Sequence, residues 1–165
     1  MQSRTSLCRV VLGSLVFALA GALSLTSLAA QADPVIGTWT LNVAKSTFKP
    51  GPALKSGTVT FSASGKGVHV VADLVDGQGA ATHTEYTGNY DGKDYPITGL
   101  PTVDVVSLKR IDANSSERTD KKAGKVVQTY HRQVAADGKT MTVTHKGTDD
   151  KGQAFTNVLL FEKKM

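Results

Sequence analysis

Cysteine is nearly absent from this sequence of 165 residues. The single cysteine is Cys8, so none occurs from residue 33 onward. Disulfide bonds, thiolate catalysis and cysteine-based zinc sites are therefore excluded for that part of the chain. Without covalent cross-links, residues 33–165 must be stabilised by a hydrophobic core, and 133 residues are enough to form one as a single domain.

Patterns that favour helices are absent as well. After residue 32, no segment repeats apolar residues at i, i+3 and i+4 for long enough to build a core helix. The same part of the chain holds 17 Thr and 15 Val but only 7 Leu, and β-branched residues favour strands. A single helical turn over residues 43–48, ended by the Pro-Gly-Pro at 50–52, is the one exception that we expect.

Motifs for catalysis and for nucleic-acid binding are also missing. The sequence has no Gly-x-Ser-x-Gly element, no phosphate-binding glycine loop and no His-x-x-x-His spacing. Its basic residues are scattered and do not form a stripe interleaved with aromatics, which a nucleic-acid-binding surface would require. We therefore assign no catalytic residues, no metal site and no cofactor, and we expect no nucleic-acid partner. Whether the protein is an enzyme stays open, with a non-enzyme favoured.

The first 32 residues have the pattern of a secretory signal peptide. Arg4 and Arg9 precede an apolar run over residues 10–23, and small residues follow up to the Ala-Gln-Ala at 30–32. This order predicts cleavage directly after that triplet. The alternative is an uncleaved membrane anchor, because residues 10–30 form a stretch of 21 residues and a spanning helix needs about 20.

Cleavage would define the organisation of the protein. We expect a signal peptide over residues 1–32 and a single domain over residues 33–165, secreted or periplasmic, with no membrane span once the signal is removed. The mature chain would carry 17 basic and 14 acidic side chains, a mild net charge of +3. The sequence leaves its oligomeric state open.

Turn signals recur along the rest of the chain. Asp-Gly pairs at 76–77, 91–92 and 137–138 favour type I′ turns between strands, in which both central residues take positive φ. The segment 116–120 has no apolar face and is expected at an edge or rim. Strands are predicted at 35–42, 57–63, 67–75, 80–90, 95–98, 104–111, 116–120, 125–135, 140–147 and 154–163. The expected fold is all-β: an antiparallel meander of about 8–10 strands, forming a sandwich or, preferably, a closed barrel without exposed edges.

Gly37-Thr38-Trp39 at the start of the first predicted strand resembles the Gly-x-Trp signature of lipocalins and related calycin barrels. The resemblance implies a lipocalin-like barrel whose Trp closes one end, packed by a basic residue of the last strand, here Lys163 or Lys164. A longer likeness also extends over most of residues 33–165. The segments 37–48, 90–96 and 106–111 look like a group of exported bacterial proteins of unassigned function, which implies fold and compartment but no activity.

The hairpin around Asp137-Gly138 predicts which side chains share a face. With a two-residue loop, the cross-strand pairs are Val134–Met141, Arg132–Val143 and Tyr130–His145. If this face lines the barrel, Arg132 needs a partner, because an unpaired buried charge is strongly unfavourable. Glu85 or the carboxylate of a bound ligand would supply it. Alternatively, Arg132 lies near the rim with its head in water.

Tyr130-x-Arg132 is similar, in reverse order, to the Arg–Tyr pair by which intracellular fatty-acid-binding proteins hold a carboxylate. The resemblance implies an apolar or amphipathic ligand bound inside the barrel, with an anionic ligand as one of the alternatives. The candidate ligand-binding residues are Trp39, Tyr130, Arg132, Met141, Val143 and His145. Further apolar walls would come from Phe61, Phe155 and Phe161.

Two other functions are open. A structural or protein-interaction module of the cell envelope would have a filled core and no ligand. A small hydrolase or isomerase would use His83 and Glu85, or His145, as acid and base, and these groups would have to converge in a pocket. A two-residue loop at Asp76-Gly77 would place His83 and Glu85 on one face with apolar residues of the preceding strand. We favour an exported protein that binds a small lipophilic ligand.

Overall fold

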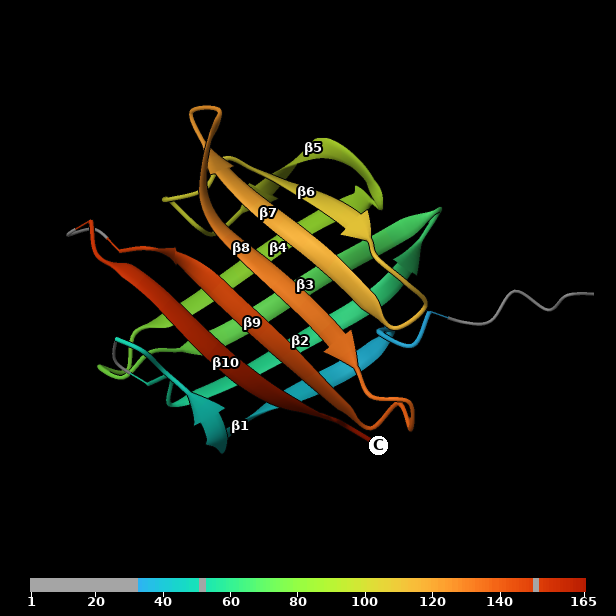
Figure 1. The fold of residues 1–165 in the computed structure, drawn as a ribbon, viewed down its shortest axis with the longest axis horizontal. Coiled ribbons are helices and arrows are strands. Elements are labelled where there is room, and N and C mark those ends of the chain that lie inside the picture. The colour runs from blue at the N-terminus through green and yellow to red at the C-terminus, as the bar shows by residue number, and fades with distance from the viewer. Residues whose placement is uncertain (1–32, 51–52, 150–151) are drawn as a thin grey trace, which may run out of the picture. The chain divides into compact units, whose positions relative to one another are not determined.

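The computed structural model describes residues 33–50, 53–149 and 152–165 (Figure 1). These residues form ten strands, which confirms the predicted all-β fold. The strands are β1 Gly37–Thr47, β2 Ser56–Ser64, β3 Gly67–Val75, β4 Ala81–Asn89, β5 Asp91–Thr98, β6 Val105–Arg110, β7 Ser115–Lys122, β8 Lys125–Val134, β9 Thr140–Thr148 and β10 Ala154–Lys163. Within the described ranges, no helix has the length and apolar character that a membrane crossing needs. The predicted signal peptide, residues 1–32, lies outside the described residues.

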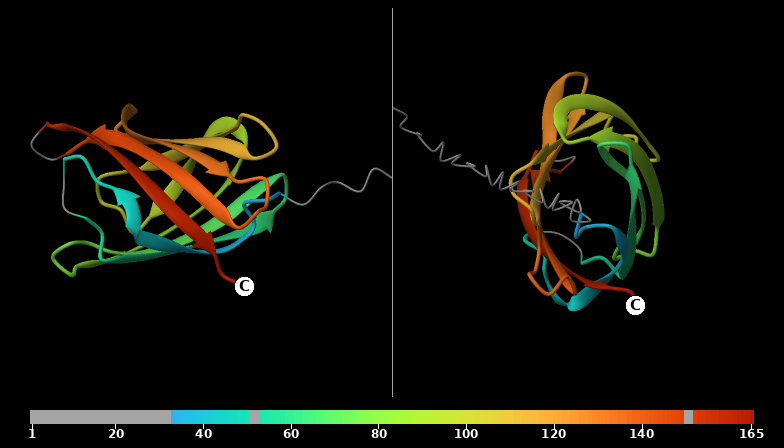
Figure 2. Two further views of the ribbon diagram at one scale, coloured as in Figure 1. Left: turned by 60° about the horizontal axis from the view of Figure 1, so that its bottom comes forward. Right: turned by 90° about the vertical axis from the view of Figure 1, so that its right-hand side faces the viewer.

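Each strand pairs antiparallel with the next one along the chain, and β1 pairs with β10 to close the barrel (Figures 1 and 2). At the closure, Trp39 of β1 lies opposite Lys163 on one side and Val59 on the other. This up-and-down order confirms the predicted lipocalin-like barrel and excludes the sandwich. Closure gives every described strand two neighbours, so no long edge is left unpaired.

One end of the barrel is closed around Trp39, whose side chain is fully buried. Its indole Nε1 donates a hydrogen bond to the Val35 carbonyl at 2.7 Å, and Lys163 Nζ lies 5.1 Å from the ring centroid. Lys163 therefore takes the place that the resemblance implied for a basic residue of the last strand. Asp33, two residues before Val35, forms an ion pair with Arg110 of β6 and ties the start of the barrel to its wall.

Strand β1 is longer than expected, and the helical turn predicted over residues 43–48 is wrong. Side-chain hydrogen bonds form here instead of helical backbone bonds: Ser46 Oγ donates to the Asn42 carbonyl at 2.8 Å, and Lys45 N–H donates to Asn42 Oδ1 at 3.1 Å. The pairing with β10 shifts register across this bulge and resumes at Thr47. Pairing with the last strand thus overrides the local preference, because it continues the ladder that closes the barrel.

Strand β7 does not lie at an edge, so the prediction for segment 116–120 is wrong. It pairs with β6 along one side and with β8 along the other. Its inward side chains are Ser116, Arg118 and Asp120, which are exposed by only 3%, 7% and 0%. An apolar face is not needed here, because Arg118 and Asp120 form an ion pair inside the barrel.

The hairpin between β8 and β9 has the predicted register. The pairs are Val134–Met141, Arg132–Val143 and Tyr130–His145. The turn itself is not type I′, because positive φ occurs at Gly138 (+67°) but not at Asp137. Ala135 N–H donates to the Thr140 carbonyl, so the loop has four residues instead of two. Both lengths are even, and the alternation of side chains therefore keeps the predicted faces.

The hairpin between β3 and β4 does not have the predicted register. Asp76 N–H donates to the Ala80 carbonyl, which leaves a three-residue loop with Gly79 at φ +96°. An odd loop length moves the side chains of one strand to the opposite face from a two-residue loop. His83 accordingly pairs with Asp73 and is exposed, instead of facing the apolar residues of β3.

Candidate functional site

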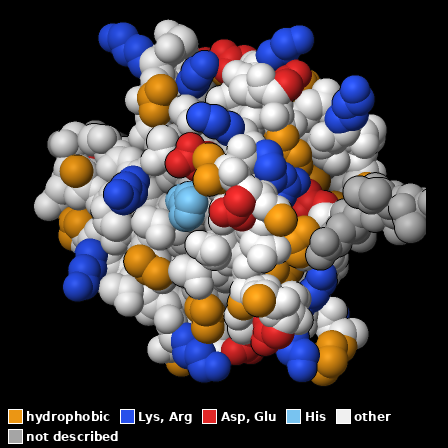
Figure 3. All heavy atoms as spheres, turned by 45° about the vertical axis from the view of Figure 1, so that its right-hand side comes forward, with side chains coloured by type: hydrophobic (Ala, Val, Ile, Leu, Met, Phe, Trp, Pro, Cys, Tyr) orange, Lys and Arg blue, Asp and Glu red, His pale blue; other side chains and the backbone are white. Residues whose placement is uncertain are grey.

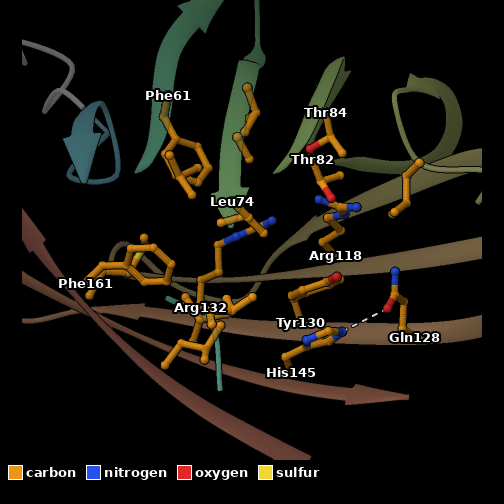
Figure 4. A pocket seen from close by; sticks show the side chains of 18 of the residues that line it. Phe61, Leu74, Thr82, Thr84, Arg118, Gln128, Tyr130, Arg132, His145 and Phe161 are labelled. Carbon is orange, nitrogen blue, oxygen red and sulfur yellow. Dashed lines mark hydrogen bonds between the residues drawn. The ribbon is translucent and has the colours of Figure 1, made fainter. Parts of the chain in front are cut away.

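A cavity of about 270 Å³ lies inside the barrel (Figure 4). Apolar side chains from four strands form much of its wall: Phe61 of β2, Leu74 of β3, Met141 and Val143 of β9, and Phe161 of β10. Residues of the β1–β2, β3–β4 and β5–β6 loops also line it, which places its mouth at the end of the barrel opposite Trp39. The cavity is therefore a one-ended apolar pocket with polar groups on part of its wall.

Arg132 extends from β8 into this cavity (Figure 4), and only 6% of the residue is exposed. Its Nη2 donates to the Tyr86 hydroxyl at 3.1 Å, and the guanidinium carbon lies 5.5 Å from the Phe61 ring centroid. Across the described residues Arg132 forms no ion pair, and Glu85 lies exposed next to His69. A buried cation held only by a phenol and aromatic rings favours an anionic group beside it.

One carboxylate does line the cavity, in the β3–β4 loop. Asp76 Oδ1 accepts the backbone N–H groups of Gln78 and Ala80 at 2.9 and 2.8 Å. This carboxylate therefore stabilises its own turn and forms no ion pair with Arg132.

The second cavity arginine, Arg118, is paired with a carboxylate. Its Nε and Nη2 donate to the two carboxylate oxygens of Asp120 at 2.5 and 2.6 Å. Its guanidinium also lies between two aromatic rings, 4.8 Å from the Tyr86 centroid and 4.7 Å from that of Tyr130. Because Asp120 neutralises it, Arg118 does not call for an anionic ligand. Arg132 is left as the cavity cation that has no counter-charge within residues 33–50, 53–149 and 152–165.

A hydrogen-bonded chain leads from Asp120 to the cavity wall. Gln128 Nε2 donates to Asp120 Oδ2 at 2.9 Å, and Gln128 Oε1 lies 2.9 Å from His145 Nε2 (Figure 4). The imidazole of His145 stacks on Tyr130 with a centroid separation of 4.1 Å, and Phe155 packs edge-on at 4.8 Å. Ring contacts and the amide together hold the imidazole in one orientation.

Burial, with a smaller contribution from the positive charge of Arg118, lowers the pKa of His145 to about 4. The folded protein therefore keeps this ring neutral, whereas the unfolded chain binds a proton near its ordinary value of 6.5. Stability supplied by the neutral ring is complete above about pH 6.5 and is lost as the pH falls towards about 4.

We expect this loss to appear when the wild type is compared with His145→Phe. Between about pH 7 and about pH 5, the unfolding free energy of the wild type should fall by about 2 kcal/mol more than that of the variant. Urea denaturation at both pH values measures the difference, and the other histidines contribute equally to both proteins. If the unfolding free energies of the two proteins decrease by the same amount, the lowered pKa of His145 is contradicted.

Five of the six predicted ligand-binding residues line the cavity together: Tyr130, Arg132, Met141, Val143 and His145. Trp39 is not among the lining residues and lies fully buried at the closed end. The sequence predicted Trp39 both as the residue that closes one end of the barrel and as part of the ligand site, and its position agrees with the first of these. Of the further apolar walls, Phe61 and Phe161 line the cavity, whereas Phe155 contacts it through His145.

Sequence reasoning missed Arg118, Asp120 and Gln128. Their signal was present, because Arg118 and Asp120 have opposite charges two residues apart in a predicted strand that has no apolar side. Side chains two residues apart on a strand point to the same face of the sheet. If the strands before and after this segment are taken as its neighbours in the barrel, its charged face is covered, and a buried ion pair is the natural interpretation.

The acid–base pair considered from the sequence does not reach the cavity. His83 Nδ1 lies 2.6 Å from Asp73 Oδ1, and Glu85 lies 3.6 Å from His69, all on the outer surface. They do not converge with His145, which lines the interior. Among the described residues, no group of three or more His, Asp or Glu side chains is placed to hold a metal ion.

Charged side chains of both signs are interspersed on the outside of the barrel. On the face shown in Figure 3, Lys and Arg side chains lie among Asp and Glu side chains. Several form ion pairs at the surface, such as Lys121 with Asp94 and Lys122 with Asp104, each at 2.7 Å. The outer face therefore shows a mixed, solvated charge pattern, and the cavity holds the more distinctive chemistry.

No protein-family model matches the chain, and no curated protein matches it. Among solved structures, the chain is similar to the protein described in "The Siderocalin Ex-FABP functions through dual ligand specificities". The identity is 13%, the match covers 79% of this chain and 74% of that chain, and the TM-score is 0.36. At that level the likeness says nothing about a ligand, and the barrel assignment depends on the strand pairing described above.

Proposed function

We propose that the protein is a secreted or periplasmic binding protein that holds a small organic anion inside its barrel, with the anionic group on Arg132. The single observation that supports this function is the guanidinium of Arg132, which is buried in the cavity and has no counter-ion in the part of the chain that the structure describes. A carboxylate would accept its remaining N–H groups in the planar geometry that guanidinium favours. The uncharged part of the ligand would contact the apolar wall.

The size of the cavity sets the size of the ligand. The cavity has a volume of about 270 Å³. This lies just below the range of roughly 300–1,000 Å³ that is usual for pockets of drug-sized ligands. A compact acid with a short apolar body fits this space better than a long acyl chain. The interaction-module alternative would have a filled interior, and the cavity does not favour it.

The test compares a carboxylate with its uncharged amide. Cinnamate and cinnamamide have nearly the same size and shape, so Arg132 should be the main source of any preference. We expect cinnamate to bind about tenfold to a hundredfold more tightly, the range for hydrogen bonds to a charged group. Isothermal titration calorimetry at neutral pH measures both affinities.

Arg132→Met should abolish that preference while leaving the protein folded, because the substitution removes a buried charge and keeps an apolar side chain of similar length. The matched control is Lys109→Met on the exposed side of β6, which removes one positive charge from the surface instead of from the cavity. The control should retain the wild-type preference. Equal affinities for cinnamate and cinnamamide in the wild type, or binding of neither, would contradict the proposed function.

A further inference from the structure

The Gln128 amide determines which nitrogen of His145 carries the hydrogen. Gln128 Nε2 donates to Asp120 Oδ2, and a carboxylate at neutral pH only accepts. Gln128 Oε1 therefore faces His145 Nε2, 2.9 Å away. An amide oxygen also only accepts, so the hydrogen of the neutral imidazole must lie on Nε2. The other ring nitrogen, Nδ1, is left with a lone pair.

His145 Nδ1 is consequently an acceptor without a donor. No hydrogen bond to Nδ1 occurs within the described residues, and the side chain lines the cavity. Stacking on Tyr130 and the edge contact with Phe155 oppose rotation of the ring. Its pKa of about 4 keeps Nδ1 unprotonated at neutral pH. The cavity thus presents a fixed lone pair in addition to the cation of Arg132.

We propose that His145 Nδ1 accepts a hydrogen bond from a hydroxyl group of the ligand, at the end away from the anionic group. The inference rests on the proposed function and specifies its ligand class: a compact organic acid that carries a hydroxyl group. A ligand without this donor would displace water from Nδ1 and leave the acceptor unpaired in an enclosed site, which is unfavourable. The hydroxyl group would therefore determine specificity.

The strand pairing places the two recognition points on neighbouring strands, on the same inner face. Arg132 pairs with Val143, and His145 lies two residues further along β9 on the same inner face. Two residues along a strand span roughly 7 Å. Val143, which lies opposite Arg132 and two residues before His145, also lines the cavity, so a ligand that contacts both groups meets apolar surface beside them. A rigid aromatic ring with a carboxylate at one end and a hydroxyl at the other has this character.

The first experiment uses the unaltered protein with cinnamate, para-hydroxycinnamate and para-methoxycinnamate. All three carry the same carboxylate, but only the hydroxyl compound can donate a hydrogen bond at the far end. The methoxy compound controls for the added size. We expect para-hydroxycinnamate to bind roughly threefold to tenfold more tightly than the other two, the net value of one neutral hydrogen bond.

Two variants separate His145 from the neighbouring hydroxyl of Tyr130. His145→Phe keeps a stacking ring but has no acceptor, so it should bind the hydroxyl and methoxy compounds equally. Tyr130→Phe also keeps the stack and should retain the wild-type preference for the hydroxyl compound. A preference that survives in His145→Phe and disappears in Tyr130→Phe would overturn the assignment.

Long-range proton–nitrogen correlation spectra of the wild type test the same assignment without any substitution, so an unfolded variant would not leave it undecided. They should show the hydrogen of His145 on Nε2 and a change at Nδ1 on addition of para-hydroxycinnamate but not of para-methoxycinnamate. A hydrogen on Nδ1 in the free protein would overturn the inference.

The outcomes distinguish the inference from the proposed function. If the three cinnamates bind equally while cinnamate still binds more tightly than cinnamamide, the role of His145 is wrong and that of Arg132 stands. If carboxylate and amide bind equally, or neither binds, the proposed function fails and the inference fails with it.

Discussion

Replacing Asp120 with alanine is expected to lower the unfolding free energy by about 3–5 kcal/mol, the cost of removing one partner of a buried ion pair. Asp120 is fully buried and accepts two hydrogen bonds from Arg118 and one from Gln128. Without it, the guanidinium of Arg118 stays inside the barrel as a second uncompensated cation close to Arg132 on the neighbouring strand. Urea denaturation with linear extrapolation measures the loss.

The double variant Arg118→Met/Asp120→Leu should recover most of that stability, because apolar side chains of similar volume often replace a buried ion pair without loss. Asp94→Ala is the matched surface control. Asp94 binds Lys121 at 2.7 Å on the surface, where its side chain is 44% exposed, so about 0–1 kcal/mol is expected. A loss for Asp120→Ala as small as that of the surface control would show that Arg118 reaches water, contrary to its burial.

Trp39→Ala is expected to cost about 3–5 kcal/mol, the usual range for truncating a large buried aromatic side chain. The residue has no exposed surface, and the substitution also removes the hydrogen bond to Val35 and the ring beneath the Lys163 ammonium. Thermal or urea unfolding measures the change. A loss below about 1 kcal/mol would mean that the closed end of the barrel can collapse around the missing ring.

Trp39→Phe separates packing from binding. It keeps an aromatic ring and should fold, and its affinity for cinnamate should equal that of the wild type because Trp39 does not line the cavity. A large loss of cinnamate affinity in this variant would return Trp39 to the binding site, where the sequence had placed it.

The two Asp-Gly hairpins show how far turn signals predict a face. At residues 137–138 the loop is longer than predicted by two residues, and Tyr130, Arg132 and His145 stay on the predicted face. At residues 76–77 the loop has three residues, and His83 changes side. In these two hairpins the Asp-Gly pair marks the turn, but the parity of the loop depends on which glycine takes positive φ, Gly79 in one and Gly138 in the other. The third pair, Asp91-Gly92, lies within β5 instead of between two strands.

Composition, turn signals and alternation were enough to predict the all-β fold, most strand positions and the shared face of Tyr130, Arg132 and His145. These properties are local: they depend on residues a few positions apart in the chain. Only the tertiary structure decided that Arg118 has a counter-ion whereas Arg132 has none among the described residues, and that Trp39, expected both to close one end and to contribute to the ligand site, does not line the cavity. Charge compensation and depth depend on which strands become neighbours when β1 meets β10, and no short stretch of sequence contains that information.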